Sequence, residues 1–326
     1  MSSSPPQSAS AQRKLGNSDI AVAPLAFGGN VFGWSIDEKT SFSILDKFVA
    51  SGLNLIDTAD VYSRWVPGNK GGESETIIGK WLAQGGRRDK VVIATKVGKD
   101  MGDGKVGLKK DYILRAVEDS LRRLQTDYID LYQSHDDDKS TPFEETLDAY
   151  GTLIQQGKVR IIGASNHDAK RLAEARAAGE KLGLPLYQTL QPEYSLIERA
   201  SFEKELEPYC LKHGVGVIGF YSLASGFLSG KYRSEADLGK SAARGGRVKG
   251  YLNQRGLKIL AALDAVSQRV DSTPASVALA WLIARPSVTA PIASATSLQQ
   301  LDALVQATQL KLSAQDIALL DQASAY

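Results

Sequence analysis

Short apolar runs rich in β-branched residues alternate along the chain with longer segments of helical hydrophobic periodicity. Because the short runs do not alternate cleanly with polar residues, they favour strands buried on both faces, as in a parallel sheet. The predicted strands are Leu25–Gly28, Leu53–Ile56, Val91–Thr95, Tyr128–Gln133, Val159–Gly163, Leu186–Leu190, Val215–Phe220 and Val288–Ile292. The predicted helices are Thr40–Ser51, Glu73–Gln84, Lys110–Leu124, Phe143–Gln156, Asp168–Leu182, Arg199–His213, Gln254–Val270 and Pro274–Ala284.

Eight strand–helix units in series predict an α/β fold of the (β/α)8 TIM-barrel type, with a doubly wound sheet as the alternative. A polar turn within Leu15–Ile20 predicts a short β-hairpin before the first unit. A long irregular stretch, 223–254, follows the seventh strand, and such loops are usually functional or disordered. We expect residues 1–13, rich in Ser and Pro, to form a disordered tail, and residues 14–326 to form a single barrel domain.

Composition narrows the function classes. The 326 residues are 43% hydrophobic and 23% charged, as expected of a globular protein with a sizeable core. The 39 Lys and Arg against 37 Asp and Glu do not point to nucleic acid or an anionic membrane as a partner. The lone cysteine, Cys210, excludes an intramolecular disulfide and zinc-site spacing, so we expect a cytoplasmic protein without a metal. No apolar run is long enough for a transmembrane helix.

Four ionisable residues stand at or just after the ends of predicted strands: Asp57, Tyr62, Lys96 and His135. In a barrel the carboxyl ends of the strands meet at one mouth, where catalytic groups lie. A Lys96 ammonium would favour the Tyr62 phenolate and lower its pKa from about 10, making the tyrosine a usable acid and base. Asp57 would keep Lys96 charged, and His135 would orient a substrate oxygen. Taken singly, each residue could equally be a structural ion pair, a wall residue or a buried histidine.

The segment Gly214–Gly219 fits the G-x-G-x-x-G pattern of dinucleotide-binding loops. That fingerprint requires a strand before the glycines and a helix after them. Here the predicted order is helix, glycines, strand. We therefore interpret these glycines as the start of a buried strand.

Several motifs together resemble the aldo-keto reductase family, over the chain from about Lys14 to its C-terminal region. They are the segments 54–62 (NLIDTADVY), 72–75 (GESE) with 78–79, 94–96 (ATK), 130–135 (DLYQSH), 163–166 (GASN), 188–194 and 223–226 (LASG). The resemblance implies a (β/α)8 barrel, a nicotinamide cofactor and reversible reduction of a carbonyl to an alcohol. Asp57, Tyr62, Lys96 and His135 match the family's catalytic four, with Tyr62 as the general acid and base.

The resemblance also implies which residues hold the cofactor. Ser165, Asn166 and Gln191 would bind the nicotinamide carboxamide, and Phe220, rather than Tyr221, would stack on its ring. Main-chain groups of the loop after the seventh strand, with Lys231, would hold the pyrophosphate, and the basic loop with Arg244 and Arg247 would cover it. The full set is Gly28, Gly29, Asp57, Ser165, Asn166, Gln191, Phe220, Tyr221, Ser222, Leu223, Ser225, Gly226, Leu228, Lys231, Arg233, Arg244, Arg247, Ser294, Thr296 and Gln300.

Two departures from the family pattern bear on specificity. Ala303 and Leu304 stand where relatives often have Glu and Asn, and the segment 294–300 holds no Lys or Arg for a 2′-phosphate. A preference for NADP(H) over NAD(H) must then rest on Arg233, Arg244 or Arg247. On the substrate side, Trp34, Trp65, Asp136 and His167 are candidate wall residues. Asp136 opens an acidic run, 136–138, which predicts an open acidic wall or a solvated loop.

Three functions compete. The leading one is an NADP-dependent reductase of aldehydes or ketones, acting also as an alcohol dehydrogenase. The second is a nicotinamide-binding regulatory subunit resembling potassium-channel auxiliary subunits, which would not need His135. The third is a Schiff-base lyase using Lys96, for which the lysine should be desolvated rather than paired with Asp57.

Overall fold

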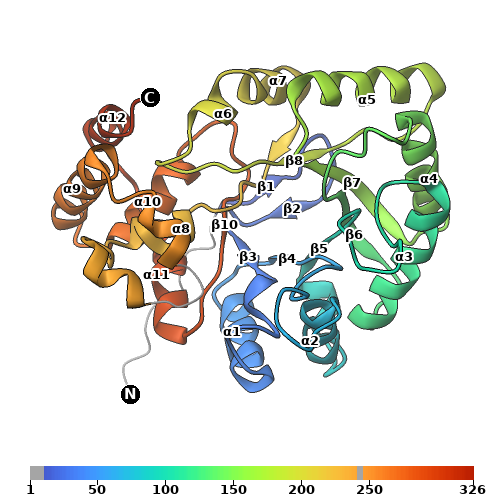
Figure 1. The fold of residues 1–326 in the computed structure, drawn as a ribbon, viewed down its shortest axis with the longest axis horizontal. Coiled ribbons are helices and arrows are strands. Elements are labelled where there is room, and N and C mark those ends of the chain that lie inside the picture. Colours follow the sequence, from blue (N-terminus) through green and yellow to red (C-terminus); the bar gives the residue numbers. More distant parts are fainter. Residues whose placement is uncertain (1–10, 241–244) are drawn as a thin grey trace.

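In the computed structural model, which describes residues 11–240 and 245–326, parallel strands at the centre are surrounded by helices (Figure 1). Among the described residues, eight strands form one parallel sheet in the order β10-β3-β4-β5-β6-β7-β8-β9. The strands are β3 (Ala26–Gly28), β4 (Leu55–Asp57), β5 (Val92–Val97), β6 (Ile129–Ser134), β7 (Val159–Ser165), β8 (Thr189–Gln191), β9 (Gly216–Val217) and β10 (Ile292–Ala293). Each lies within or overlaps a predicted strand.

The sheet closes on itself between β9 and β10. The Thr289 N–H donates to the Val217 carbonyl at 2.8 Å, and the Ile292 N–H donates to the Gly219 carbonyl at 2.8 Å. These bonds join the last strand in space to the segment that leads into β10. The predicted (β/α)8 barrel is confirmed, and an open doubly wound sheet is excluded.

The helices agree with the predicted ones except at Gly245–Lys249, which lies in the stretch predicted to be irregular, near the C-terminus and at one break. They are α1 (Glu38–Ala50), α2 (Glu73–Leu82), α3 (Lys110–Leu124), α4 (Phe143–Gln155), α5 (Ala169–Leu182), α6 (Ala200–Glu203), α7 (Leu206–His213), α8 (Gly245–Lys249), α9 (Gln254–Arg269), α10 (Pro274–Ile283), α11 (Leu298–Gln309) and α12 (Ala314–Ala323). The predicted helix Arg199–His213 is two helices, because Pro208 is tolerated only in the first turn of a helix.

Two C-terminal helices, α11 and α12, were not predicted. The helix of the eighth unit is α11, which follows β10, whereas α9 and α10 both precede that strand. Each missed helix begins at a serine cap: the Ser297 side chain accepts from the Gln300 N–H, and Ser313 and Asp316 form a capping box. The helix α12 packs on α9 at one side of the barrel (Figure 1, left).

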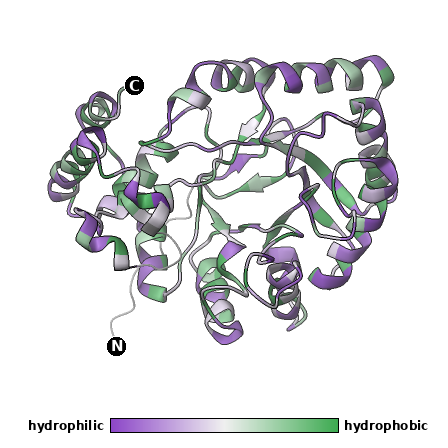
Figure 2. Ribbon diagram, in the orientation of Figure 1, coloured by the Kyte–Doolittle hydropathy of each residue, from purple (hydrophilic) through white to green (hydrophobic). Residues whose placement is uncertain are grey.

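Two apolar cores hold the barrel together. One lies between the strands and the surrounding helices, whose outward faces are polar while the strands and inner faces are apolar (Figure 2). The other fills the barrel interior and includes Leu55 and Leu131 from the strands, Ile218 directly after β9, and Leu15 and Val22 from the N-terminal segment. Burial of these side chains supplies the main favourable term for folding.

The predicted hairpin, β1 (Arg13–Lys14) with β2 (Ala21–Val22), covers the N-terminal end of the barrel. Gly16 has φ +61°, and a side chain there would collide with the carbonyl oxygen of Gln188, just before β8. Arg13 was expected in the disordered tail but belongs to β1, and its guanidinium donates to the carbonyls of Ile283 and Val288 at 2.8 Å. Residues 11 and 12 are exposed and form no regular secondary structure, and residues 1–10 lie outside the described residues.

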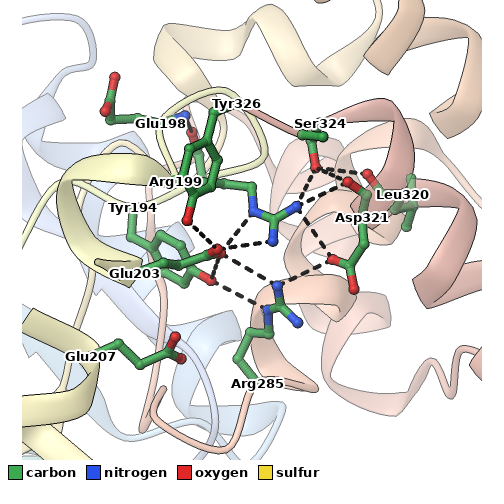
Figure 3. Close-up of polar contacts among 12 residues, drawn as sticks. Tyr194, Glu198, Arg199, Glu203, Glu207, Arg285, Leu320, Asp321, Ser324 and Tyr326 are labelled. Carbon is green, nitrogen blue, oxygen red and sulfur yellow. Dashed lines mark hydrogen bonds and ion pairs between the residues drawn. The ribbon is translucent and has the colours of Figure 1, made fainter. Parts of the chain in front are cut away.

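A network of ion pairs fixes the segment that follows β8 (Figure 3). The Arg199 guanidinium donates to both carboxylate oxygens of Glu203, at 2.7 and 2.9 Å. Arg285 donates to Glu203 at 3.4 Å and to Asp321 of α12 at 3.1 Å, and the Tyr194 hydroxyl donates to Glu203 at 2.7 Å. The network therefore connects the end of α10, α12 and the segment that leads from Gln191 into α6.

The glycines of the fingerprint-like segment have the structural role expected of them. Gly214 ends α7 in the left-handed conformation, at φ +65°. The observed order is helix, glycine cap, strand, so no dinucleotide-binding turn forms at this place. None of the helices in the described ranges is long and apolar enough to span a lipid bilayer.

Candidate active site

The four predicted catalytic residues meet at the carboxyl ends of three adjacent strands. Asp57 ends β4, Tyr62 lies in the loop after it, Lys96 lies near the end of β5 and His135 follows β6. Asp57, Tyr62 and His135 line a cavity of about 600 Å³, a size typical of small-molecule sites. Lys96 is fully buried behind them.

Lys96 connects the acidic residue to the tyrosine. Its ammonium nitrogen lies 2.7 Å from Asp57 Oδ2 and 3.2 Å from the Tyr62 hydroxyl oxygen, and it also donates to the Thr58 carbonyl at 2.7 Å. The second oxygen of Asp57 accepts from the Gln191 side-chain amide at 2.9 Å and from that of Gln133 at 3.3 Å. Since the Tyr62 oxygen accepts from Lys96, its own proton is free to be donated elsewhere.

Burial and neighbouring charges shift the pKa values of Lys96 and Tyr62 in opposite directions. Burial acts to lower the pKa of Lys96, but the Asp57 carboxylate and Tyr62 outweigh it, so the pKa is raised and the ammonium stays charged. Burial raises the pKa of Tyr62, and Lys96 opposes that rise without cancelling it. The expected lowering of the Tyr62 pKa is therefore corrected: Lys96 does act in that direction, but desolvation is the larger effect.

His135 faces the cavity as a neutral imidazole. Burial, followed by the positive charges of Lys96 and Lys99, puts its pKa well below the ordinary value. Its ring centroid lies 6.0 Å from that of Tyr62, and its Nδ1 has no hydrogen-bond partner within the described part of the chain. A neutral histidine beside the tyrosine hydroxyl can hydrogen-bond to a substrate oxygen without competing for the proton.

The residues predicted to bind a carboxamide, Ser165, Asn166 and Gln191, line the same cavity. The Ser165 hydroxyl donates to the Gln191 carbonyl at 2.9 Å, and the Asn166 amide donates to the His135 carbonyl at 2.9 Å. The Asn166 amide NH₂ is engaged by this bond and the Gln191 amide NH₂ by its bond to Asp57, which leaves the side-chain oxygens of both residues as acceptors. Phe220 and Tyr221 also line the cavity, with ring centroids 5.2 Å apart.

Strained backbone surrounds the predicted phosphate side. Tyr221, Ala224 and Ser225 have φ values of +54°, +46° and +56°, a conformation that costs a non-glycine residue on the order of 1 kcal/mol or more. Such strain gathers at functional sites, where successive backbone N–H groups can face an anion. From this loop, Ser222, Leu223, Ser225 and Gly226 line the cavity.

Of the predicted phosphate-side residues, two lie outside the cavity lining. Leu228 is fully buried outside the lining. Lys231 also lies outside it but packs beside Gly226, where an added Cβ would be 3.6 Å from its ammonium nitrogen.

The three candidate arginines differ in position. Arg247 lines the cavity, lies 3.9 Å above the Tyr221 ring and forms an ion pair with Glu193 at 2.9 Å. Arg233 lies outside the lining and donates to both oxygens of Asp264. Arg244 lies outside the described residues. Of the three, Arg247 is thus the one whose cavity position supports contact with a cofactor.

Near β10, the predicted cofactor residues are only partly together. Ser294 lines the cavity, and its hydroxyl oxygen lies 2.7 Å from both the Gly28 carbonyl oxygen and the Asn30 side-chain oxygen. Thr296 and Gln300 lie outside the lining and bond to each other. Gly28 is in the lining, whereas Gly29 is buried behind it. Leu304 is in the core, so that position offers no polar group to an adenine.

The substrate side combines aromatic walls with an ion pair. Trp34 and Trp65 line the cavity with ring centroids 5.5 Å apart, and Trp65 lies 5.7 Å from the Tyr62 ring. Asp136 is outside the lining and pairs with Lys99 at 2.6 Å, and Lys99 is the member that lines the cavity.

The expectation of an open acidic wall was wrong, because each of the three aspartates has a partner. Besides the Asp136 pair with Lys99, Asp137 accepts from Arg171, and Asp138 accepts from the Leu108 N–H at 2.8 Å.

The prediction that His167 forms part of the substrate wall is also corrected. His167 is buried outside the cavity lining, with its ring 5.8 Å from that of Tyr187 and its Nδ1 2.8 Å from the Ser165 carbonyl, so it supports the wall from behind.

Sequence reasoning missed three polar residues at this site, besides Ile292 and Ala293 in the cavity lining. Lys99 and Asn30 line the cavity, and Gln133 binds Asp57. Gln133 had a signal, since a polar residue within a buried strand must find a partner inside the barrel. Lys99 had a weaker sequence signal, its place three residues after Lys96 in the loop that follows β5.

Across residues 11–240 and 245–326, no group of three or more His, Cys, Asp or Glu side chains is placed to hold a metal ion.

Comparisons with known proteins show the family to which the chain belongs. The family model described as "Aldo/keto reductase family" matches residues 24–325. The chain is 37% identical to the uncharacterized oxidoreductase YrpG of Bacillus subtilis, over 94% of each protein. It is 32% identical to Protein tas of Escherichia coli, over 94% of this chain and 96% of that protein. It is also 32% identical to a probable voltage-gated potassium channel subunit beta of Arabidopsis thaliana, over 91% of each. The chain therefore belongs to the aldo/keto reductase family.

Proposed function

We propose that this protein is an NAD(P)H-dependent oxidoreductase that reversibly reduces an aldehyde or ketone to an alcohol, with NADP(H) as the preferred cofactor. The observation that carries the proposal is the chain Asp57–Lys96–Tyr62, which ends at a cavity beside a neutral His135. A buried ammonium next to a tyrosine hydroxyl is suited to stabilising charge as a proton leaves that oxygen.

The cavity residues fit a nicotinamide cofactor at one end better than at the other. The side-chain oxygens of Asn166 and Gln191 are acceptors for a carboxamide NH₂, and Phe220 offers an aromatic face. The strained loop from Tyr221 to Gly226, with Arg247, suits an anionic phosphate. At the adenine end Leu304 is in the core, so recognition there must come from other groups. When bound, a nicotinamide supplies or accepts the hydride.

In reduction, the Tyr62 hydroxyl donates its proton to the substrate oxygen. Lys96 stabilises the negative charge that then develops on the tyrosine oxygen, and Asp57 keeps Lys96 charged and in place. His135 hydrogen-bonds to the substrate oxygen and directs it toward Tyr62. In the oxidation of an alcohol the roles reverse, and the Tyr62 phenolate takes the hydroxyl proton.

The regulatory-subunit alternative is supported by the similarity to the Arabidopsis channel subunit. Against it stands His135, which completes the proton-transfer site and has no evident role in a subunit that only binds nicotinamide. The lyase alternative is disfavoured, because Lys96 is paired with Asp57 and its raised pKa keeps it protonated, whereas a Schiff-base lysine must be neutral to attack.

The single cysteine, buried and free, supports a reducing cytoplasmic location.

A panel of aldehydes, ketones and alcohols, run with NADPH and NADH in both directions, tests the proposal. Reduction of carbonyls at rates well above the background without enzyme would support it. Tight nicotinamide binding without turnover of any compound would overturn it in favour of the regulatory subunit. Borohydride trapping of a substrate adduct on Lys96 would overturn it in favour of the lyase.

A further inference from the structure

Across the cavity from the predicted phosphate side stands a cation that the proposed mechanism does not use. The phosphate-side residues follow β9 and β10, which are neighbours where the barrel closes. Lys99 follows β5 and its partner Asp136 follows β6, which lie on the opposite side of the ring of strands. Lys99 therefore faces the part of the cavity that a cofactor spanning β9 and β10 would leave to the substrate.

The orientation of this ion pair decides which charge the substrate meets. Lys99 lines the cavity, whereas Asp136 does not, although the two groups are only 2.6 Å apart. The Asp57 carboxylate in the lining is already paired with Lys96. Within the described residues, the charged groups that the cavity still offers to a ligand are thus the two cations Lys99 and Arg247.

The electrostatic reach of Lys99 extends to the reacting centre. Its ammonium contributes to the low pKa of His135, after burial and Lys96. The aromatic side chains Trp34, Tyr62 and Trp65 form a continuous edge-to-face row on the same cavity. A substrate between these walls, with its carbonyl at Tyr62, would place its remaining part among aromatic faces and one ammonium group.

Resting on the proposed reductase function, we propose that the carbonyl substrate carries an anionic group, such as a carboxylate, and that Lys99 binds it. An ammonium has three N–H donors, so Lys99 can hold Asp136 and a second anion together. Both partners of the resting pair are about two-fifths exposed, at 37% and 44% of their side-chain surface. Such a pair is weak and exchanges readily, so Asp136 holds Lys99 in position without blocking it.

Two matched aldehydes test the proposal: 4-carboxybenzaldehyde and its methyl ester, which share the ring and differ in charge. We expect the wild-type kcat/KM to favour the acid, mainly through KM. Lys99→Gln should lower kcat/KM for the acid about 10-fold, the scale of one partly exposed charge-assisted contact, and change that for the ester less than about 2-fold. Lys99→Arg should keep the preference. Asp136→Asn, which removes a negative charge that repels the bound anion, should strengthen it.

Lys105→Gln is the control for charge alone, because Lys105 is an exposed lysine of the same loop outside the cavity lining. It should leave the acid-to-ester ratio unchanged. A parallel fall of acid and ester in Lys99→Gln, or an equal fall in Lys105→Gln, would overturn the anion proposal and leave the reductase function standing. If the wild type reduces neither these two aldehydes nor any other carbonyl of the panel described above, the reductase function fails instead.

A binding measurement separates these outcomes without turnover. The alcohol products, 4-hydroxymethylbenzoate and its methyl ester, can be titrated against the fluorescence of the cavity tryptophans Trp34 and Trp65. We expect the benzoate to bind more tightly than the ester, and Lys99→Gln to remove that difference. Equal affinities of the two compounds for the wild type would contradict the anion site whatever the enzyme turns over.

Discussion

The ammonium nitrogen of Lys96 lies 3.2 Å from the hydroxyl oxygen of Tyr62, yet the pKa of that hydroxyl is raised. Burial disfavours the phenolate more strongly than the neighbouring charge favours it. The tyrosine is therefore held protonated at neutral pH in this state, ready to act as an acid. Lys96 limits the rise of the Tyr62 pKa but does not bring that pKa into the neutral range.

The pH dependence of the reaction should follow from this arrangement. Reduction needs protonated Tyr62, so we expect its kcat/KM to stay level through neutral pH and to fall only above about 10, the ordinary tyrosine value. Alcohol oxidation needs the phenolate and should rise over the same alkaline range. In Lys96→Met the alkaline limb should move further upward, because the opposing charge is gone. A fall in reduction between about pH 6 and 8 would instead assign the proton to a histidine.

Cofactor preference should depend on Arg247. Arg247→Ala should weaken NADPH binding about 10-fold and NADH binding less, since an arginine–phosphate contact is lost only with NADPH. Arg233→Ala is the matched control, because Arg233 is paired with Asp264 outside the cavity lining. Affinities measured by fluorescence titration decide the matter. Equal losses of affinity for NADPH and NADH in Arg247→Ala would refute pairing of Arg247 with the 2′-phosphate. The same measurement would then be made on Arg244→Ala.

Glu193 should limit the access of Arg247 to a phosphate. The ion pair between the two, at 2.9 Å, holds the guanidinium over Tyr221. Glu193→Gln removes the competing charge, so we expect tighter NADPH binding and a smaller effect on NADH. Weaker binding of both cofactors would mean that the pair orders the loop rather than competing for the arginine.

The buried carboxyl of Asp60 should make stability depend on pH. Neither of its oxygens has a hydrogen-bond partner in the described ranges, and burial, followed by the charge of Glu75, puts its pKa well above the ordinary value. The group stays protonated when folded but ionises in the unfolded chain above about pH 4. As the pH rises from about 4 toward the pKa of Asp60 in the folded protein, ionisation of this group in the unfolded chain therefore lowers the free energy of unfolding.

Asp60→Asn keeps the shape but cannot ionise. Relative to the wild type, we expect the variant to gain at least about 1 kcal/mol of unfolding free energy between pH 5 and pH 8, measured by urea denaturation. All other titrating groups are shared by the two proteins and cancel in this comparison. If the difference in unfolding free energy between the variant and the wild type stays constant with pH, Arg123 keeps Asp60 ionised in the folded protein.

The ion-pair network after β8 should matter for stability far more than exposed pairs do. Arg199 and Glu203 are each 11% exposed, whereas Lys80 and Glu38 are 50% and 46% exposed. Arg199→Met leaves a largely buried carboxylate with fewer partners and should lower the free energy of unfolding by about 2 to 3 kcal/mol. Lys80→Met should change it by less than about 0.5 kcal/mol. Similar losses in the two variants would contradict this account.

The strands were predictable because a barrel strand is buried on both faces, so each appears as an isolated apolar run. The two missed C-terminal helices are no shorter and no more polar than several of the predicted ones, and the pair Ser313 and Asp316 is a capping signal that marks the start of α12. The break between α6 and α7 was also marked, by Pro208. These errors came from periodicity taken without helix-terminus signals.

The four candidate catalytic residues could be placed at one mouth because strand ends converge in this fold. Their pKa values could not be predicted, because desolvation depends on how deeply the barrel buries Tyr62. The acidic wall failed for a related reason, since the Lys99 and Arg171 that neutralise Asp136 and Asp137 come from other loops and helices. Contacts between segments far apart in sequence set the charge of the site.

The most direct test of the central claim is the single-turnover rate of carbonyl reduction in Tyr62→Phe, measured with bound NADPH and a neutral aldehyde. The hydroxyl is removed while the ring and its contact with Trp65 remain, so cofactor affinity should be nearly unchanged. We expect the rate to fall at least about 100-fold, the scale of general acid catalysis. A rate equal to that of the wild type would contradict the assignment of Tyr62 as the proton donor.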